Sequence, residues 1–398
     1  MREHVYLFRG LVLFIFALSC QPAGALPFDH RDDTPEALTD SIRQWWRGTD
    51  HTVHLDPETL NFLFGLLADQ RVTTVTRSSG WNVPRKAAIE VLSRAPNPVE
   101  PRLEKMFSHE QPLYRMAAIH LMAVRGGFEG SRIDRLFHLC SDEDESVRGE
   151  AAQFLARVPE RHEEAATQVI KLLEGNDAAS YEAARSAGYL APMLSPATAM
   201  RLAKVLFKTQ QMVHRADFWA IISLGRLMPL LPEAAQRDLV DQMLPLLKTK
   251  RHQRIRVGVI SAAGPLAEKA LPGLRDLLAA AEGKDKAIFA GYLWKVEGKP
   301  DSVYGIFMEA VGSAEGSRRH YGFKGLQLMG PQAKAAVPAL QDLLQQEKTS
   351  VRTGALKTLA AIGPGAVAAA PLVRRHLKAP DKNERALAQE ALDAIQVW

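Results

Sequence analysis

Two stretches near the C-terminal end carry the clearest pattern of hydrophobic and polar positions. In residues 350–362 and again in 369–377, apolar side chains recur at helical spacing. Such spacing places them on one face of an α-helix. Gly363-Pro364 lies between the stretches, and this dipeptide ends helices. The pattern predicts two amphipathic helices whose apolar faces comprise Val351, Ala355, Leu359 and Ile362 in the first, and Ala369, Leu372, Val373 and Leu377 in the second.

The same unit recurs along the chain at intervals of 33 residues. Gly330-Pro331 and Gly363-Pro364 are 33 apart, as are Pro338 and Pro371. Arginines keep this step at positions 319, 352 and 385, and again at 115 and 148. A residue recurring at a fixed place in a repeat is expected to be structural. A residue able to cap a helix also recurs near the start of each first helix, which predicts N-caps at Ser146, Ser317, Ser350 and Asn383.

A period of this length predicts an all-α fold, an α-solenoid superhelix of about nine or ten antiparallel helix pairs. The period is regular from residue 250 onward and looser over 83–250, where Tyr181 and His214 stand at two arginine positions. We expect residues 81–398 to form the array. Residues 26–80 are expected to form an N-terminal helical cap, with helices over 33–46 and 56–68.

The unit resembles the short bacterial type of HEAT repeat, an armadillo-like solenoid. The residues that carry the resemblance are Val351-Arg352, Ala355, Ile362-Gly363-Pro364 and Pro371-Leu372. It implies an extended curved groove, lined mainly by the second helices of the pairs, that binds another protein. It also implies little room for a buried active site.

The amino-acid composition indicates what kind of core the chain forms and which partners are expected. Apolar residues make up 46% of the 398 residues and aromatic residues 7%, which suits closely packed helices better than a β-sandwich. The net charge of +5 is too small to imply nucleic acid by itself, and nucleic acid is not the expected partner.

The first 25 residues have the features of a signal peptide. Arg2 and Arg9 precede the apolar run 11–18, and the small residues Ala23 and Ala25 follow it. The run is too short to span a bilayer. We therefore expect an exported protein, periplasmic or secreted. Lipid attachment at Cys20 is the alternative.

No motif indicates a catalytic, cofactor-binding or metal site. The chain lacks a phosphate-binding glycine loop and a Gly-x-Ser-x-Gly nucleophile motif, and no histidine cluster has a full set of zinc ligands nearby. Cys140 follows Phe137 and Leu139 on an apolar stretch and is expected to be a buried structural thiol. The chain is not expected to be an enzyme.

The one local candidate for partner binding is a basic segment at 248–256. It carries five positive charges within nine residues, so it could face an acidic protein, lipid headgroups or a polyanion. The alternative is a solvated loop between helix pairs. The predicted contact residues are Lys248, Lys250, Arg251, His252, Arg254 and Arg256.

The leading functional hypothesis is an exported, non-catalytic scaffold that binds another protein, an acidic one among the options. A polyanion- or lipid-binding protein is an alternative, and a HEAT-like lyase or glycosylase is another. The oligomeric state does not follow from the sequence.

Overall fold

The computed structural model describes residues 35–48, 54–67, 84–96, 99–125, 127–158, 160–211 and 216–395, and every regular element within them is a helix. The predicted all-α class is therefore confirmed. The proposed signal peptide, Cys20, His214 and most of the junction between cap and array lie outside the described residues.

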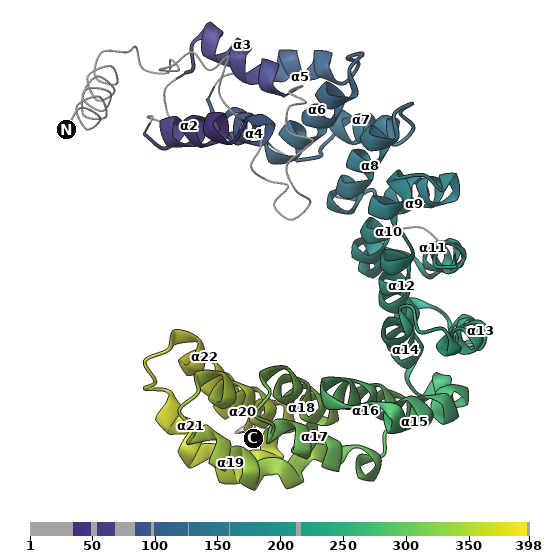
Figure 1. Ribbon diagram of the computed structural model, residues 1–398, viewed down its shortest axis with the longest axis vertical. Helices are drawn as coiled ribbons and strands as arrows, with labels where there is room; N and C mark the ends of the chain where they lie inside the picture. Colours follow the sequence, from purple (N-terminus) through teal and green to yellow (C-terminus); the bar gives the residue numbers. More distant parts are fainter. Residues whose placement is uncertain are drawn as a thin grey trace, which may run out of the picture. The chain divides into compact units, whose positions relative to one another are not determined.

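The α-helices alternate between two layers, which we name the even layer and the odd layer after the helix numbers (Figure 1). The even layer comprises α2 (Pro35–Arg47), α4 (Pro84–Arg94), α6 (Pro112–Val124), α8 (Glu145–Phe154), α10 (Ala179–Leu190), α12 (Ala216–Leu227), α14 (Gln253–Ala262), α16 (Gly283–Glu297), α18 (Gly316–Met329), α20 (Thr349–Ile362) and α22 (Lys382–Ile395). The odd layer comprises α3 (Pro57–Leu66), α5 (Glu100–Met106), α7 (Ser131–Leu139), α9 (His162–Gly175), α11 (Pro196–Thr209), α13 (Glu233–Met243), α15 (Leu271–Ala280), α17 (Tyr304–Val311), α19 (Val337–Leu344) and α21 (Ala370–His376).

Short 3₁₀ helices follow several of these helices. They are η1 (Leu155–Arg157), η2 (Ala191–Met193), η3 (Met228–Leu230), η4 (Leu244–Lys248), η5 (Gly264–Ala270), η6 (Pro300–Ser302), η7 (Gly330–Ala336) and η8 (Gly363–Ala369).

Contacts divide the chain into two compact units. Unit 1 is Met1–Thr198 with Lys204–Ala220, and unit 2 is Ala199–Ala203 with Ile221–Trp398. Within each unit, consecutive even helices pack directly against one another, from α2 to α10 in unit 1 and from α14 to α22 in unit 2. Consecutive odd helices touch less. Each unit, taken by itself, therefore curves toward its even layer.

The helix pairs differ from the predicted pairs by one helix. α17 packs extensively against α18, and α19 against α20, whereas α20 has few contacts with α21 and touches instead the 3₁₀ turn that precedes α21. A structural pair is thus an odd helix followed by an even one. The sequence pattern joined α20 to α21 because Gly363-Pro364 marks the turn between them, although the tighter packing lies across the preceding loop. Within the described residues, ten odd helices are each followed by an even one, from α3–α4 to α21–α22, in agreement with the predicted nine or ten pairs.

The Gly-Pro turns end even helices as the sequence predicts. Gly264, Gly330 and Gly363 have φ of +57°, +56° and +68°, a conformation that strains any residue with a side chain. A Cβ on Gly363 would also lie 3.7 Å from the Ala394 carbonyl oxygen of the next even helix. Each turn continues as a seven-residue 3₁₀ helix, and the next odd helix carries its proline in its first turn, where no N–H is needed.

The recurring arginines occupy one structural position, the fourth residue of an even helix. At this position one guanidinium nitrogen donates to two carbonyls of the preceding loop, five and six residues earlier. Arg115 Nη1, for example, donates to His109 O at 2.6 Å and Glu110 O at 2.9 Å. Equivalent loop contacts are made by Arg148, Arg319, Arg352 and Arg385. We call these residues the arginine ladder.

Three members of the ladder also bind a carboxylate of the next repeat through the Nε and Nη2 edge of the guanidinium. Arg115 binds Asp142 at 2.8 and 2.7 Å, and Arg352 binds Glu384 at 2.8 and 2.7 Å. Arg148 binds Asp177 in the same way. The ladder therefore ties each loop to its own helix and each repeat to its neighbour, and the expected structural role is confirmed.

The predicted N-caps are wrong by two residues. Ser146, Ser317, Ser350 and Asn383 are each the second residue of an even helix. The capping acceptor comes earlier: Asp144 Oδ1 accepts from the Ser146 and Val147 N–H groups at 2.9 and 3.1 Å, and Asp381 Oδ1 accepts from Glu384 N at 2.7 Å. Each helix therefore begins earlier than the serine or asparagine suggests.

One described stretch, Thr349–His376, is long and apolar enough to cross a membrane by length and composition alone. It comprises α20, η8 and α21, with half of its most apolar window buried inside the array. Its apolar residues Leu359 and Val373 are in the core. We therefore assign the stretch to the packed solenoid.

Removal of Arg352 tests the ladder. Arg352→Leu removes the guanidinium from the Glu384 side chain, which is only 1% exposed and then keeps the contact with His376 Nδ1 at 2.7 Å. Losing one partner of a buried ion pair costs about 3–5 kcal/mol. Arg385→Leu is the control because Arg385 has the two carbonyl contacts without a carboxylate contact among the described residues. Urea unfolding at pH 7 should show a clearly larger loss for Arg352→Leu, and equal losses would contradict a stabilising pair.

The same pair predicts an acid dependence. The hydrogen bond from Arg352 lowers the pKa of Glu384, against its burial, and His376 lowers it further. A carboxylate with a lowered folded pKa stabilises above its unfolded pKa, about 4.3, and that stability is lost as pH falls through the folded value. Between pH 7 and pH 3, the wild type should therefore lose more of its free energy of unfolding than Arg352→Leu.

Candidate partner-binding surfaces

The predicted basic segment lies where η4 leads into α14, in unit 2. Lys248 ends η4, Lys250 and Arg251 follow in the loop, and all three are exposed. His252 is half-buried and adopts a left-handed conformation, with φ of 55°, immediately before α14. The Arg251 Nε donates to His252 Nε2 at 3.3 Å. This part of the segment is accessible to a partner.

Arg256 belongs to the ladder instead. It is the fourth residue of α14, is 6% exposed, and donates from Nη1 to Arg251 O at 2.8 Å. The 33-residue spacing misses it because α14 has 10 residues, whereas α18 and α20 have 14. Arg254 is half-exposed and pairs with Asp285 at 3.0 Å. Lys248, Lys250 and Arg251 are thus exposed cations of the segment, whereas Arg256 belongs to the arginine ladder.

This division predicts two different mutant phenotypes. Lys248→Ala/Lys250→Ala/Arg251→Ala should leave the free energy of unfolding within about 0.5 kcal/mol of wild type, as surface changes usually do. Arg256→Ala should lower it by about 1–3 kcal/mol, because the buried Arg256 side chain and its hydrogen bond to the Arg251 carbonyl are lost.

Retention on heparin measures whether the exposed cations of the segment bind a polyanion. If the exposed cations form a polyanion site, the triple variant should elute at lower salt while Arg256→Ala, if folded, elutes as wild type. Failure of the wild type to bind at low salt would exclude polyanion binding by this segment.

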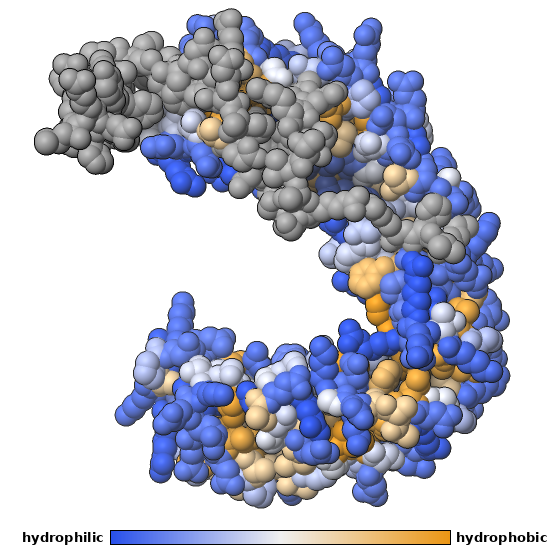
Figure 2. Space-filling model, viewed as in Figure 1, coloured by the Kyte–Doolittle hydropathy of each residue, from blue (hydrophilic) through white to orange (hydrophobic). Residues whose placement is uncertain are grey.

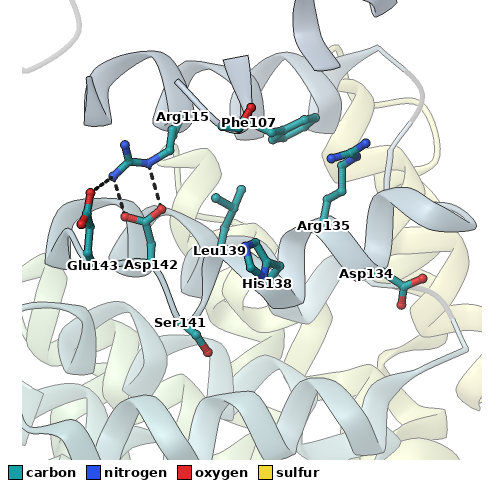
Figure 3. A pocket seen from close by; sticks show the side chains of 10 residues that line it. Phe107, Arg115, Asp134, Arg135, His138, Leu139, Ser141, Asp142 and Glu143 are labelled. Atoms are coloured by element: carbon teal, nitrogen blue, oxygen red, sulfur yellow. Dashed lines mark hydrogen bonds and ion pairs between the residues drawn. The ribbon is translucent and has the colours of Figure 1, made fainter. Parts of the chain in front are cut away.

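A pocket of about 590 Å³ opens in unit 1 beside the pair Arg115–Asp142 (Figure 3). Phe107 and Leu139 supply its apolar surface, and Arg135 and His138 of α7 lie at its edge. Its charged groups already have partners. Arg115 binds Asp142 and lies 3.7 Å from Glu143, Arg135 pairs with Glu104, and Asp134 accepts from Arg161 at 2.6 Å. Little electrostatic attraction remains for a charged ligand.

A second group of charges lies on neighbouring even helices of unit 1. His120 Nε2 on α6 lies 2.5 Å from Glu150 Oε1 on α8. On α10, Glu182 pairs with Arg185 at 3.1 Å. Burial lowers the pKa of Arg85 on α4, and Glu150 opposes that shift. Arg85 is the second residue of its helix, so it does not occupy the ladder position.

Burial raises the pKa of Glu182; Arg185 opposes the shift and the Glu150 carboxylate adds to it. A raised folded pKa means that stability falls as pH rises through that value. Glu182→Gln cannot become charged, so it should be more stable than wild type at pH 7.5 and little different at pH 4. Urea unfolding at the two pH values checks this, and an equal difference at both would contradict it.

The ladder is interrupted where α10 and α12 begin. Their fourth residues are Glu182 and Trp219, and the preceding residues are Tyr181 and Phe218. The Trp219 ring makes edge-on contacts with Tyr181 and Phe218, at centroid distances of 6.5 and 5.5 Å. The sequence indicated an irregularity at Tyr181. It did not indicate that aromatic side chains meet there.

Large exposed hydrophobic side chains are found at the even helices and at the turns that follow them. In the described part of the chain, the large exposed ones lie either on even helices or on the 3₁₀ turns that directly follow them. They are Val124, Tyr189, Phe218 and Leu328 on even helices, and Met193, Leu230 and Val367 on turns. Figure 2 shows a mostly hydrophilic surface with hydrophobic side chains exposed among the polar ones. Exposed apolar side chains that gather on neighbouring elements are candidates for a partner-binding surface.

Cys140 is buried, and its burial raises the pKa of the thiol to about 12. A neutral buried thiol is neither a nucleophile nor a metal ligand, which agrees with its expected structural role. Among the described residues, no group of three or more His, Cys, Asp or Glu side chains is arranged to hold a metal ion.

Comparison with known protein families finds a match for the C-terminal part of the chain. Residues 309–393, from α17 into α22, match the family of HEAT repeats. The described residues as a whole have the fold of an α-solenoid. No curated protein resembles it closely enough in sequence to count as a relative.

Solved structures resemble it in fold. Kap121p has a TM-score of 0.69 at 12% identity, over 98% of this chain and 50% of Kap121p. Importin beta has a TM-score of 0.64 at 13% identity, over 92% of this chain and 57% of importin beta. Kap121p has also been solved bound to Nup53p, with a TM-score of 0.65 at 11% identity, over 85% of this chain and 44% of that one. The chain therefore spans about half the length of these proteins.

Proposed function

We propose that this HEAT-repeat chain is a non-catalytic scaffold that binds another protein along its even layer. The carrying observation is the distribution of exposed hydrophobic side chains, which avoids the odd helices throughout the described residues. A HEAT array presents an extended surface of consecutive helices, and aromatic residues such as Tyr189 are the type enriched in protein interfaces.

Three further observations support this function. The similar structure of Kap121p is described with a bound protein, Nup53p. The charged groups of the pocket in Figure 3 are already paired with one another, so that pocket has the character of a repeat junction. The only cysteine described is a neutral buried thiol.

We also propose that the scaffold acts outside the cytoplasm. The support is the N-terminal sequence alone, with its two arginines, eight-residue apolar run and Ala23-Gly24-Ala25. Edman sequencing of the mature protein from the cell envelope tests this, because a first residue at Leu26 requires cleavage after Ala25. Lipid attachment would instead leave Cys20 modified and the protein in the membrane fraction.

Site-specific photo-crosslinking tests the binding surface. We place p-benzoylphenylalanine at Tyr189 in unit 1 or Leu328 in unit 2, both on even helices. The matched controls are Lys105 on α5 and Arg374 on α21, which are exposed on odd helices. Even-layer positions should yield a discrete adduct in envelope extract that unlabelled protein competes away, and odd-layer positions should not. Adducts confined to the odd layer, or none at all, would refute the proposal.

A further inference from the structure

A second groove lies in unit 2, between the consecutive even helices α18 and α20. Its volume is about 480 Å³. Arg319, His320 and Lys324 line it from α18, and Lys357 lines it from α20. No aspartate or glutamate is among the residues that line it. Unlike the pocket in Figure 3, this groove therefore carries positive charge without a matching carboxylate in its walls.

A glycine creates the groove. The Phe323 ring, 5% exposed, lies against the backbone of Gly354, where a Cβ would be only 2.6 Å from the ring. The ring thus forms an apolar floor. At the far end, a hydrogen bond of 3.3 Å from Gln327 to Thr358 joins the two helices. The longer polar side chains stand on either side of this floor.

Arg319 differs from the three ladder arginines that bind a carboxylate of the next repeat. Its Nη1 donates to Ser313 O and Ala314 O, at 2.6 and 3.4 Å. Unlike Arg115, Arg148 and Arg352, it binds no carboxylate among the described residues.

Among the described residues, Arg319 lacks a carboxylate partner because of the sequence of the next repeat. The carboxylates of the ladder follow their arginines by 27, 29 or 32 residues. The same steps from Arg319 lead to Gln346, Lys348 and Val351. The carbonyl contacts hold the guanidinium in place, and its Nε and Nη2 edge remains available in the groove. A guanidinium edge of this kind binds carboxylates in a bidentate geometry.

We propose that this groove binds an acidic, extended peptide segment of a protein partner, with one carboxylate on the Nε and Nη2 edge of Arg319. The proposal rests on the scaffold function proposed above and names its partner's chemistry. Lys324 and Lys357 would attract further carboxylates, and the Ser350 and Thr353 hydroxyls in the groove wall could bond peptide groups. From Arg319 to Gln327 the helix rises about 12 Å, the length of three to four extended residues.

Fluorescence anisotropy of the full chain with a fluorescein-labelled hexaglutamate peptide at 50 mM NaCl tests the site. Lys324→Glu/Lys357→Glu should weaken binding by at least tenfold. The control, Arg374→Glu/Arg375→Glu, makes the same change in net charge on exposed positions of α21 and should change it by less than twofold. Equal weakening by both variants, or no binding by the wild type, would overturn the proposal.

A conservative pair of variants isolates the guanidinium edge. Arg319→Lys keeps the charge but loses the bidentate geometry, and should weaken the peptide three- to tenfold. Arg385→Lys loses equivalent loop contacts outside the groove and should leave affinity unchanged. If both variants weaken binding alike, the role of Arg319 is only structural and the proposal fails.

Competition distinguishes the ligand class. Unlabelled hexaglutamate should displace the probe, whereas inorganic phosphate at the same concentration should not. Heparin serves as a further competitor. If heparin displaces hexaglutamate, and both charge-reversal variants weaken heparin binding equally, the chain binds polyanions in general and the proposal is wrong.

The crosslinking experiment separates this proposal from the scaffold function. If the groove variant loses hexaglutamate but keeps the Leu328 crosslink, the scaffold function stands and the partner binds elsewhere. If hexaglutamate binds but no crosslink forms at any position, the groove stands and the scaffold function fails.

Discussion

The arginine at the fourth residue of α6, α8, α14, α18, α20 and α22 is the contact that recurs most regularly in the repeat architecture. A loop entering a helix carries carbonyl groups that no helical N–H can satisfy, and unpaired polar groups in a packed array are costly. The planar guanidinium solves this locally, because one nitrogen reaches two loop carbonyls, as Arg148 does with Asp142 and Glu143. Its opposite edge is then free to join the next repeat, as Arg148 does with Asp177.

Function is best sought where this device is incomplete. At α10 and α12 the fourth residues are Glu182 and Trp219, and aromatic side chains meet there. At α18 the arginine is present but the next repeat supplies no carboxylate at the usual steps, so Arg319 faces a groove lined by cations. An array built from one repeated contact can thus gain a binding surface where the arginine is kept and its carboxylate partner is omitted. The rest of the fold is then little affected.

The basic segment shows how one run of charge divides once the chain folds. Lys248, Lys250 and Arg251 are exposed, whereas Arg256 is buried as a ladder residue. Charge counting treats these residues alike because it contains no information on which side of a helix each one lies. Helix α14 is short, and this shifts its ladder arginine out of the 33-residue step.

The sequence by itself determined the helical class, the number of helix pairs, the Gly-Pro turns and the structural nature of the arginines. These follow from local rules: helical periodicity, the positive φ that Gly330 and Gly363 tolerate, and repetition at a fixed step. Only the tertiary structure decided which helices pair, where the caps lie and which arginines lack an acidic partner. Those depend on contacts between residues about 30 positions apart, such as Arg352 with Glu384, and the absence of such a contact at Arg319 becomes visible only when the next repeat is packed beside it.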